Sequence, residues 1–196
     1  LSAMAQDAKA LVRDLITTHS MPVSFHPGVA HACWSEAEVR HSHAYAAKLA
    51  KDYGYDQIEP LDRSAIRSLI GSQAYQGGDL DHGAGHIHPL NFAIGLAKAA
   101  KDAGAQIFEL SEVLALDQGP HPLVTTAQGQ VSCNHVILAA NGYLGGLNRE
   151  VAAKVMPINN FIIATKPLGA QAAQILSQPI AVADTKFVVN YWRLSE

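Results

Sequence analysis

Cysteine is scarce in this chain, and several features that would indicate a particular class of protein are absent. Only Cys33 and Cys133 occur among 196 residues, without a CxxC motif, which excludes a disulfide framework and fits a reducing compartment. The net charge of −3, with no block of one sign, gives no basic surface for nucleic acid. No apolar run approaches the roughly 18 residues of a membrane span, and no signal peptide leads the chain. We therefore expect a soluble cytoplasmic protein.

Local motifs for covalent catalysis are also missing. Neither GxSxG nor SxxK occurs, which disfavours a hydrolase. Gly83-Ala84-Gly85 begins like the dinucleotide fingerprint GxGxxG, but His88 takes the place of the third glycine and we expect no strand before it. A nucleotide-binding protein would then carry its phosphate loop elsewhere, in sequence that precedes Leu1.

Three histidines form the one cluster with metal-ligand character. His82, His86 and His88 lie within seven residues, and three imidazoles can ligate zinc. No HExxH-type base accompanies them, and histidines in a glycine-rich loop more often line a pocket or face solvent. A metal-dependent enzyme is therefore an alternative and not the leading hypothesis.

Hydrophobic periodicity predicts helices and strands in succession, which is typical of a mixed α/β fold. A capping box, Ser35 with Glu38, begins one helix, and Gly54 ends it. Pro89 suits the first turn of another helix. The expected helices cover residues 1–18, 36–53, a short segment after Asp62, 89–103 and 170–176. The expected strands cover residues 23–34, 58–61, 105–109, 113–116, 124–127, 130–133, 136–138, 157–166 and 186–194, with a polar, glycine-rich stretch over 71–88.

The most informative segment is Val131 to Leu147. A short apolar run, Val136 to Leu138, leads directly into Ala139-Ala140-Asn141-Gly142. A buried strand that ends in such small side chains lets a flat or charged group approach the backbone closely. In open α/β sheets, nucleotide cofactors bind beyond the carboxyl ends of the strands. The segment therefore predicts the edge of a cofactor cleft.

Short motifs recur in a fixed order along nearly the whole chain. They are Tyr53-Gly54, Leu61-Asp62, Ile66-Arg67, Ile70-Gly71-Ser72, Tyr75, Gly77-Gly78, Gly85 to Asn91, Ser111-Glu112-Val113, Val136 to Gly145 and Met156 to Asn160. As a set they resemble the D-amino-acid-oxidase-like FAD-dependent amine oxidoreductases, the superfamily of glycine and sarcosine oxidases. Within it the chain is most similar to the γ-glutamylputrescine oxidoreductase branch.

This resemblance implies a partial Rossmann-type FAD-binding domain interwoven with part of an antiparallel-sheet substrate domain. Residues 76–150 would belong to the FAD domain, and residues 1–75 and 151–196 to the substrate domain. The enzyme would oxidise an amine to an imine, which water hydrolyses to an aldehyde. FAD supplies the redox chemistry, and the protein positions the small-molecule amine.

The resemblance also implies roles for particular residues. The backbone of Val113 would hold the adenine end of FAD, and the corner Ala139, Ala140, Asn141 and Gly142 would pack near the cofactor. Many relatives have Thr or Gly where Asn141 stands, so only the backbone role carries over there. His86 and His88 would lie near the substrate pocket, and no residue is assigned as the catalytic base.

Parts of such an enzyme are expected outside the sequence. The glycine-rich phosphate loop would precede Leu1, and the last strands of both domains would follow Glu196. Because FAD affinity depends largely on a pyrophosphate bound at a helix N-terminus, we expect this internal fragment to hold FAD weakly or not at all and to be inactive. A non-catalytic binding domain is a second alternative. The amine, oxidase or dehydrogenase behaviour and the oligomeric state stay open.

Overall fold

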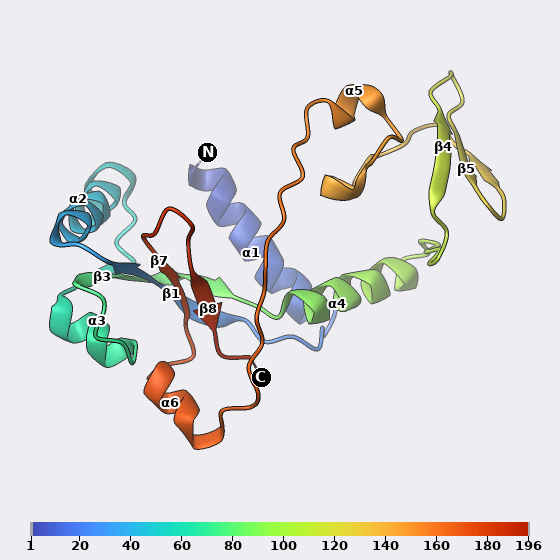
Figure 1. The fold of residues 1–196 in the computed structure, drawn as a ribbon. Coiled ribbons are helices and arrows are strands. Elements are labelled where there is room, and N and C mark those ends of the chain that lie inside the picture. The colour runs from blue at the N-terminus through green and yellow to red at the C-terminus, as the bar shows by residue number, and fades with distance from the viewer. Residues whose placement is uncertain (1, 196) are drawn as a thin grey trace. The chain divides into compact units, whose positions relative to one another are not determined.

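The computed structural model describes residues 2–195 and divides into two compact units (Figure 1). The sheet unit comprises residues up to Ala105 together with those from Lys166 onward, and the hairpin unit comprises Gln106–Thr165. Both contain helices and strands, as the sequence predicts. No helix among residues 2–195 is long and apolar enough to cross a membrane.

A five-stranded mixed sheet organises the sheet unit, in the order β2-β3-β1-β7-β8. Its strands are β1 (His26–Cys33), β2 (Ile58–Leu61), β3 (Gly77–His86), β7 (Ala181–Asp184) and β8 (Tyr191–Arg193). The central strand β1 runs antiparallel to β3 and parallel to β7. Strands β2 and β8 pair antiparallel at the two edges.

The two faces of this sheet differ in chemistry because side chains alternate along each strand. On the core face, Ala30, Leu80 and Val182 pack with Ile66 of α3 (Arg63–Leu69). On the opposite face, His31 lies beside Asp79 in the β1–β3 register, and α2 (Glu36–Tyr53) covers part of it. The core face therefore stabilises the unit, and the opposite face carries the His31–Asp79 pair.

Helix termini follow the capping residues in the sequence. The Ser35 side chain accepts the Glu38 N–H while the Glu38 carboxylate accepts the Ser35 N–H, which confirms the capping box of α2. Gly54 ends this helix in a left-handed conformation with φ of 65°. The Asp62 side chain caps α3. The helices α1 (Ser2–Thr18) and α4 (Pro89–Asp102) are confirmed as well.

The glycine-rich stretch is a strand, which corrects the prediction of a polar connection over 71–88. Strand β3 contains Gly77, Gly78, Gly83 and Gly85, and therefore includes the partial fingerprint. A Cβ on Gly78 would overlap the His31 carbonyl oxygen, and a Cβ on Gly85 would overlap the Phe25 ring. The glycines here allow neighbouring groups to approach closely, a reason for strand glycine that composition alone does not reveal.

The hairpin unit contains a three-stranded antiparallel sheet, β4 (Val113–Asp117), β5 (Leu123–Thr126) and β6 (Gln130–Ser132), followed by η1 (Asn141–Tyr143) and α5 (Arg149–Ala152). The predicted hairpin across Gln128-Gly129 is confirmed. The strands predicted at 105–109, 136–138 and 157–166 are wrong, because these residues have irregular backbone. Their apolar side chains find no sheet to join and are largely exposed, for example Ile137, Phe161 and Ile162.

The C-terminal part of the sheet unit differs from the prediction in detail. A short helical segment, η2 (Gly169–Gln171) with α6 (Ala172–Ile175), matches the expected helix. The final strand β8 is shorter than the predicted 186–194, and β7 was not predicted at all. The sheet unit and the hairpin unit also have other bounds than the predicted segments 1–75, 76–150 and 151–196, because β3 joins the same sheet as β1 and β2. Which segments form an FAD or a substrate domain stays a prediction.

Candidate functional site

The residues predicted to hold the cofactor all lie in the hairpin unit. Val113 begins β4, an edge strand whose other side pairs with β5. Ala139 and Asn141 are exposed, Ala140 and Gly142 are half-buried, and Asn141 adopts a positive φ of 48°. The corner is therefore accessible and has small side chains, as predicted. It does not follow a strand, however, so its predicted position at the carboxyl end of a parallel sheet is wrong for these residues.

A small apolar hollow of about 110 Å³ lies beside this corner. Gly142 contributes to it, and a Cβ built on that glycine would only reach ordinary contact with Pro157 at 3.6 Å. The other lining residues are Leu144, Gly145, Ala152, Val155 and Pro157. The corner thus has backbone that a planar group could approach, and its role in binding FAD stays a prediction.

The three histidines of the metal alternative hold separate protein partners. His82 on β3 pairs with Glu59 at 2.8 Å, and the His86 Nε2 lies 3.2 Å from the Pro179 carbonyl oxygen. The His88 Nδ1 accepts the Asn91 N–H at 3.3 Å and so caps α4. Among residues 2–195, no group of three or more His, Cys, Asp or Glu is arranged to hold a metal ion. The histidine cluster in the sequence is therefore not a cluster in space.

A polar chain crosses the face of the sheet that α2 partly covers. The Ser42 hydroxyl of α2 donates to Asp79 Oδ2, and His31 Nδ1 lies 2.9 Å from Asp79 Oδ1. Because a carboxylate only accepts, the His31 ring must donate from Nδ1. Serine donates here to the aspartate and not to the imidazole, so this arrangement lacks the activated nucleophile of a serine hydrolase.

The His31–Asp79 pair is suited to holding a proton. The hydrogen bond that His31 donates to Asp79 raises the pKa of His31 above its ordinary value near 6.5, although partial burial opposes the shift. The Asp79 side chain is buried and the His31 side chain is about half exposed, so the ring can exchange a proton with solvent or a bound molecule. The sequence offers no local motif for this pair, because its members lie 48 positions apart.

Cys33 lies near the same polar chain but is inert in character. Its side chain is fully buried, and burial, followed by the charges of Asp79 and Glu38, raises the pKa of its thiol to about 11. A thiolate is the reactive form of cysteine, so this thiol is a poor nucleophile at neutral pH.

An aromatic cluster lies on the core face of the five-stranded sheet, where β1 and β7 end. It consists of Trp34, Tyr75 and Trp192, with ring centroids 5.1 Å apart for Trp34 and Tyr75 and 6.2 Å apart for Tyr75 and Trp192. The Trp34 indole donates to the buried carboxylate of Asp184 at 3.0 Å. Burial opposes ionisation, but hydrogen bonds from Asn190 and Trp34 lower the pKa of Asp184. No local sequence motif indicates this cluster, because Trp34 and Asp184 lie 150 positions apart.

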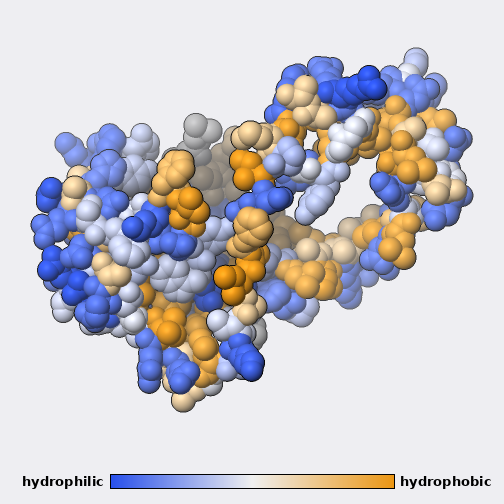
Figure 2. Space-filling model, viewed as in Figure 1, coloured by the Kyte–Doolittle hydropathy of each residue, from blue (hydrophilic) through white to orange (hydrophobic). Residues whose placement is uncertain are grey.

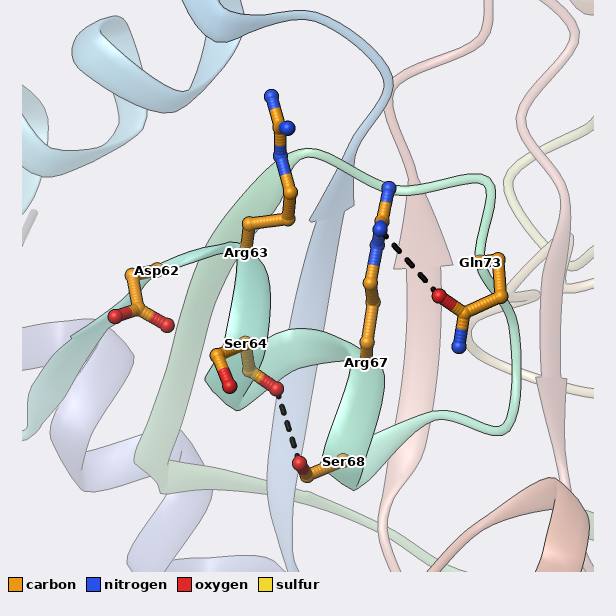
Figure 3. Close-up of a pocket in the computed structure, with 6 residues that line it drawn as sticks. All are labelled: Asp62, Arg63, Ser64, Arg67, Ser68 and Gln73. Carbon is orange, nitrogen blue, oxygen red and sulfur yellow. Dashed lines mark hydrogen bonds between the residues drawn. The ribbon is translucent and has the colours of Figure 1, made fainter.

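An open polar hollow of about 620 Å³ lies along α3 (Figure 3). Arg63 and Arg67 project from the helix into this region, and Arg67 donates to the Gln73 side chain at 3.3 Å. Both arginines already have other partners: Arg63 pairs with Glu36 at 3.0 Å, and Arg67 Nε donates to the Tyr75 carbonyl. Arg67 therefore anchors the loop that carries Tyr75.

The amino-acid sequence was compared with families of known proteins, and one family model matches the whole chain. The family model described as "FAD dependent oxidoreductase" (DAO) matches residues 1–196. The probable oxidoreductase OrdL of Rhizobium meliloti (strain 1021) is 34% identical over 98% of this chain and 45% of its own length. The γ-glutamylputrescine oxidoreductase of Escherichia coli (strain K12) is 32% identical over 100% of this chain and 46% of its own length.

A solved structure supports the fold. The crystal structure of L-proline dehydrogenase from P. horikoshii superimposes with a TM-score of 0.71 over 97% of this chain and 51% of that chain, at 15% identity. This likeness confirms the predicted fold class. The chain spans slightly less than half the length of the curated relatives that it matches.

Proposed function

Because the chain belongs to the FAD dependent oxidoreductase family, we propose that it works as part of an FAD-dependent enzyme that oxidises the C–N bond of an amine. The observation that carries this proposal is the family match along the whole chain. The 32% identity to a γ-glutamylputrescine oxidoreductase favours a γ-glutamyl-polyamine as substrate, with an amino acid such as glycine as the second candidate. We further propose a cytoplasmic enzyme that acts on a small molecule and not on nucleic acid.

Val113 and the corner Ala139 to Gly142 are the residues proposed to contact the cofactor. Their small side chains and accessible backbone fit a large planar group. Bound FAD supplies a hydride acceptor for the carbon that carries the amine. The resulting imine would then be hydrolysed by water to an aldehyde and an amine or ammonia.

The proposal includes a dependence on further sequence. Relatives are about twice as long as this chain, and tight binding of a dinucleotide requires a helix N-terminus at its pyrophosphate. We expect the 196-residue chain to retain little FAD and to turn over no amine. His86 and His88 remain proposed pocket residues, with His88 also capping α4.

The test compares two purified proteins, the 196-residue chain and a chain extended at both ends by the protein's own flanking residues. Flavin absorbance after gel filtration measures retention of FAD, and anaerobic addition of γ-glutamylputrescine or glycine measures reduction of the flavin. We expect a yellow, amine-reducible extended protein and a colourless shorter chain.

Each result has a definite consequence. An extended protein without flavin would overturn the proposed function and favour a non-catalytic binding domain. A flavin that no amine reduces would overturn the substrate class. Stoichiometric flavin on the 196-residue chain would contradict only the proposed dependence on flanking sequence. Re-oxidation by air of the reduced protein would identify an oxidase.

A further inference from the structure

The ammonium group of Lys186 lies over the face of a tryptophan in the aromatic cluster. Lys186 Nζ is 4.1 Å from the centroid of the Trp34 ring, well within the range of a cation–π contact. The lysine side chain is a four-carbon chain that ends in a primary ammonium group. The structure therefore contains, from the protein's own chain, an example of the ligand class that this ring accommodates.

The buried carboxylate of Asp184 strengthens the attraction of this ring for a cation. Its hydrogen-bond partners are neutral N–H groups, from the Trp34 indole, the Asn190 side chain, and the backbone of Asn190 and Lys186. The negative charge thus adds to the quadrupole of the ring. The hydrogen bond from the indole to a carboxylate also polarises the ring and makes its face more electron-rich.

The cluster lies at the carboxyl ends of two neighbouring parallel strands. Trp34 directly follows β1, and Thr185 directly follows β7, and these two strands are parallel. Their carboxyl ends therefore lie at the same end of the sheet, and ligands bind beyond the carboxyl ends of the strands in open α/β sheets. The Trp34 N–H donates to Thr185 Oγ1 at 3.2 Å, which joins the two strand ends.

The Lys186 side chain can move away from the Trp34 ring. It lies on the exposed loop between β7 and β8, and its side chain can swing into solvent without disturbing the Asp184 hydrogen bonds, which use only its backbone. Trp34 and Trp192 keep their places through packing against the core of the sheet. The cation can therefore be exchanged while the aromatic surface stays fixed.

We infer that the aromatic cluster of Trp34, Tyr75 and Trp192, with Asp184, is a binding site for a primary alkylammonium group that displaces the Lys186 ammonium. The inference rests on the proposed function only for the identity of the natural ligand, which would be the free ammonium end of the amine substrate. Binding of an alkylammonium ion by the site itself requires neither FAD nor turnover.

Intrinsic fluorescence gives a direct test, because the chain has only two tryptophans and both belong to the cluster. The 196-residue chain is titrated with n-butylammonium chloride at constant ionic strength, with 1-butanol and sodium butanoate as neutral and anionic probes of similar size. We expect a saturable fluorescence change with n-butylammonium alone. An equal response to 1-butanol, or no response to n-butylammonium, would overturn the inference.

Variants test the role of Lys186. Lys186→Met empties the cation position and should tighten n-butylammonium binding about three- to tenfold, because the external ion no longer competes with an internal one. Lys186→Arg keeps a cation there and should give no such gain. Lys101→Met, on α4, removes the same charge elsewhere and should behave as the unchanged chain. Equal affinity in Lys186→Met and Lys101→Met would contradict displacement.

A further variant tests the carboxylate. Asp184→Asn removes the charge and should weaken n-butylammonium binding at least threefold, with circular dichroism melting used to select conditions in which the variant is folded. If it does not fold, the Lys186 series decides the question alone. Failure of these titrations would leave the proposed function intact, since flavin retention and reduction in the extended protein are measured independently.

Discussion

The two units of this molecule differ in the solvent exposure of similar apolar residues. In the sheet unit, Ile66 and Val182 are fully buried between α3 and the five-stranded sheet. In the hairpin unit, Ile162 and Ile163 are each 91% exposed. Figure 2 shows apolar side chains distributed over the surface around β4, β5 and α5.

This difference in exposure follows from how much sheet surface each unit has to cover its apolar side chains. The sheet unit closes its core because β1 has neighbours on both sides and helices lie on both faces. The hairpin unit has three short strands in one small sheet, too little surface to cover its Ile- and Phe-rich segments. Exposed apolar segments of this kind mark surfaces that bind further protein or a ligand, which agrees with the proposed need for additional sequence.

The largest expected effect sharpens this contrast in the core. Ile66→Ala should reduce the free energy of unfolding by about 2–5 kcal/mol, because it leaves a cavity beneath the sheet. Ile162→Ala makes the same chemical change at an exposed position and should alter stability by only about 0.5 kcal/mol. Urea unfolding followed by tryptophan fluorescence and circular dichroism measures both. Comparable losses would show that the hairpin unit buries Ile162 in solution.

A second effect concerns close backbone approach. Gly78→Ala should cost about 1–3 kcal/mol, since the new methyl group would force β3 away from the His31 carbonyl of β1. Gly146→Ala in the hairpin unit meets no atom within 4 Å and should be nearly neutral. Thermal melts of the two variants provide the measurement. A neutral Gly78→Ala would contradict the tight pairing of β1 and β3.

The smallest effect is electrostatic. Because Asp79 raises the folded-state pKa of His31, their interaction stabilises the chain fully below about pH 6.5 and is lost as pH rises through the raised pKa. The ring is half exposed, so solvent screening limits the contribution to about 0.5 kcal/mol or less. His31→Asn should remove this part of the pH dependence of unfolding. The matched control is His121→Asn, the same substitution at an exposed histidine of the hairpin unit.

Local chemistry explains which predictions from sequence succeed. The ends of α2 follow from Ser35, Glu38 and Gly54, residues that interact within one or two turns. The Gln128-Gly129 hairpin is confirmed for the same reason, since Thr126 and Gly129 close it by local hydrogen bonds. These features need no distant partner, so the sequence pattern is sufficient.

Features that depend on distant partners were missed or placed wrongly. Val136 to Leu138 has the composition of a strand but finds no neighbour to pair with, and Gly78 belongs to a strand only because β1 passes beside it. The His31–Asp79 pair and the Trp34–Asp184 contact join positions 48 and 150 residues apart. No local motif encodes such pairs.

The amino-acid sequence by itself determined the helices, their caps, the tight hairpin and the family, because each is written in short-range spacing or in ordered motifs. Only the tertiary structure decided that three neighbouring histidines take separate partners, and that two tryptophans and an aspartate from opposite ends of the chain meet. Sheet pairing, which brings remote segments within hydrogen-bonding distance, is the physical reason for this division.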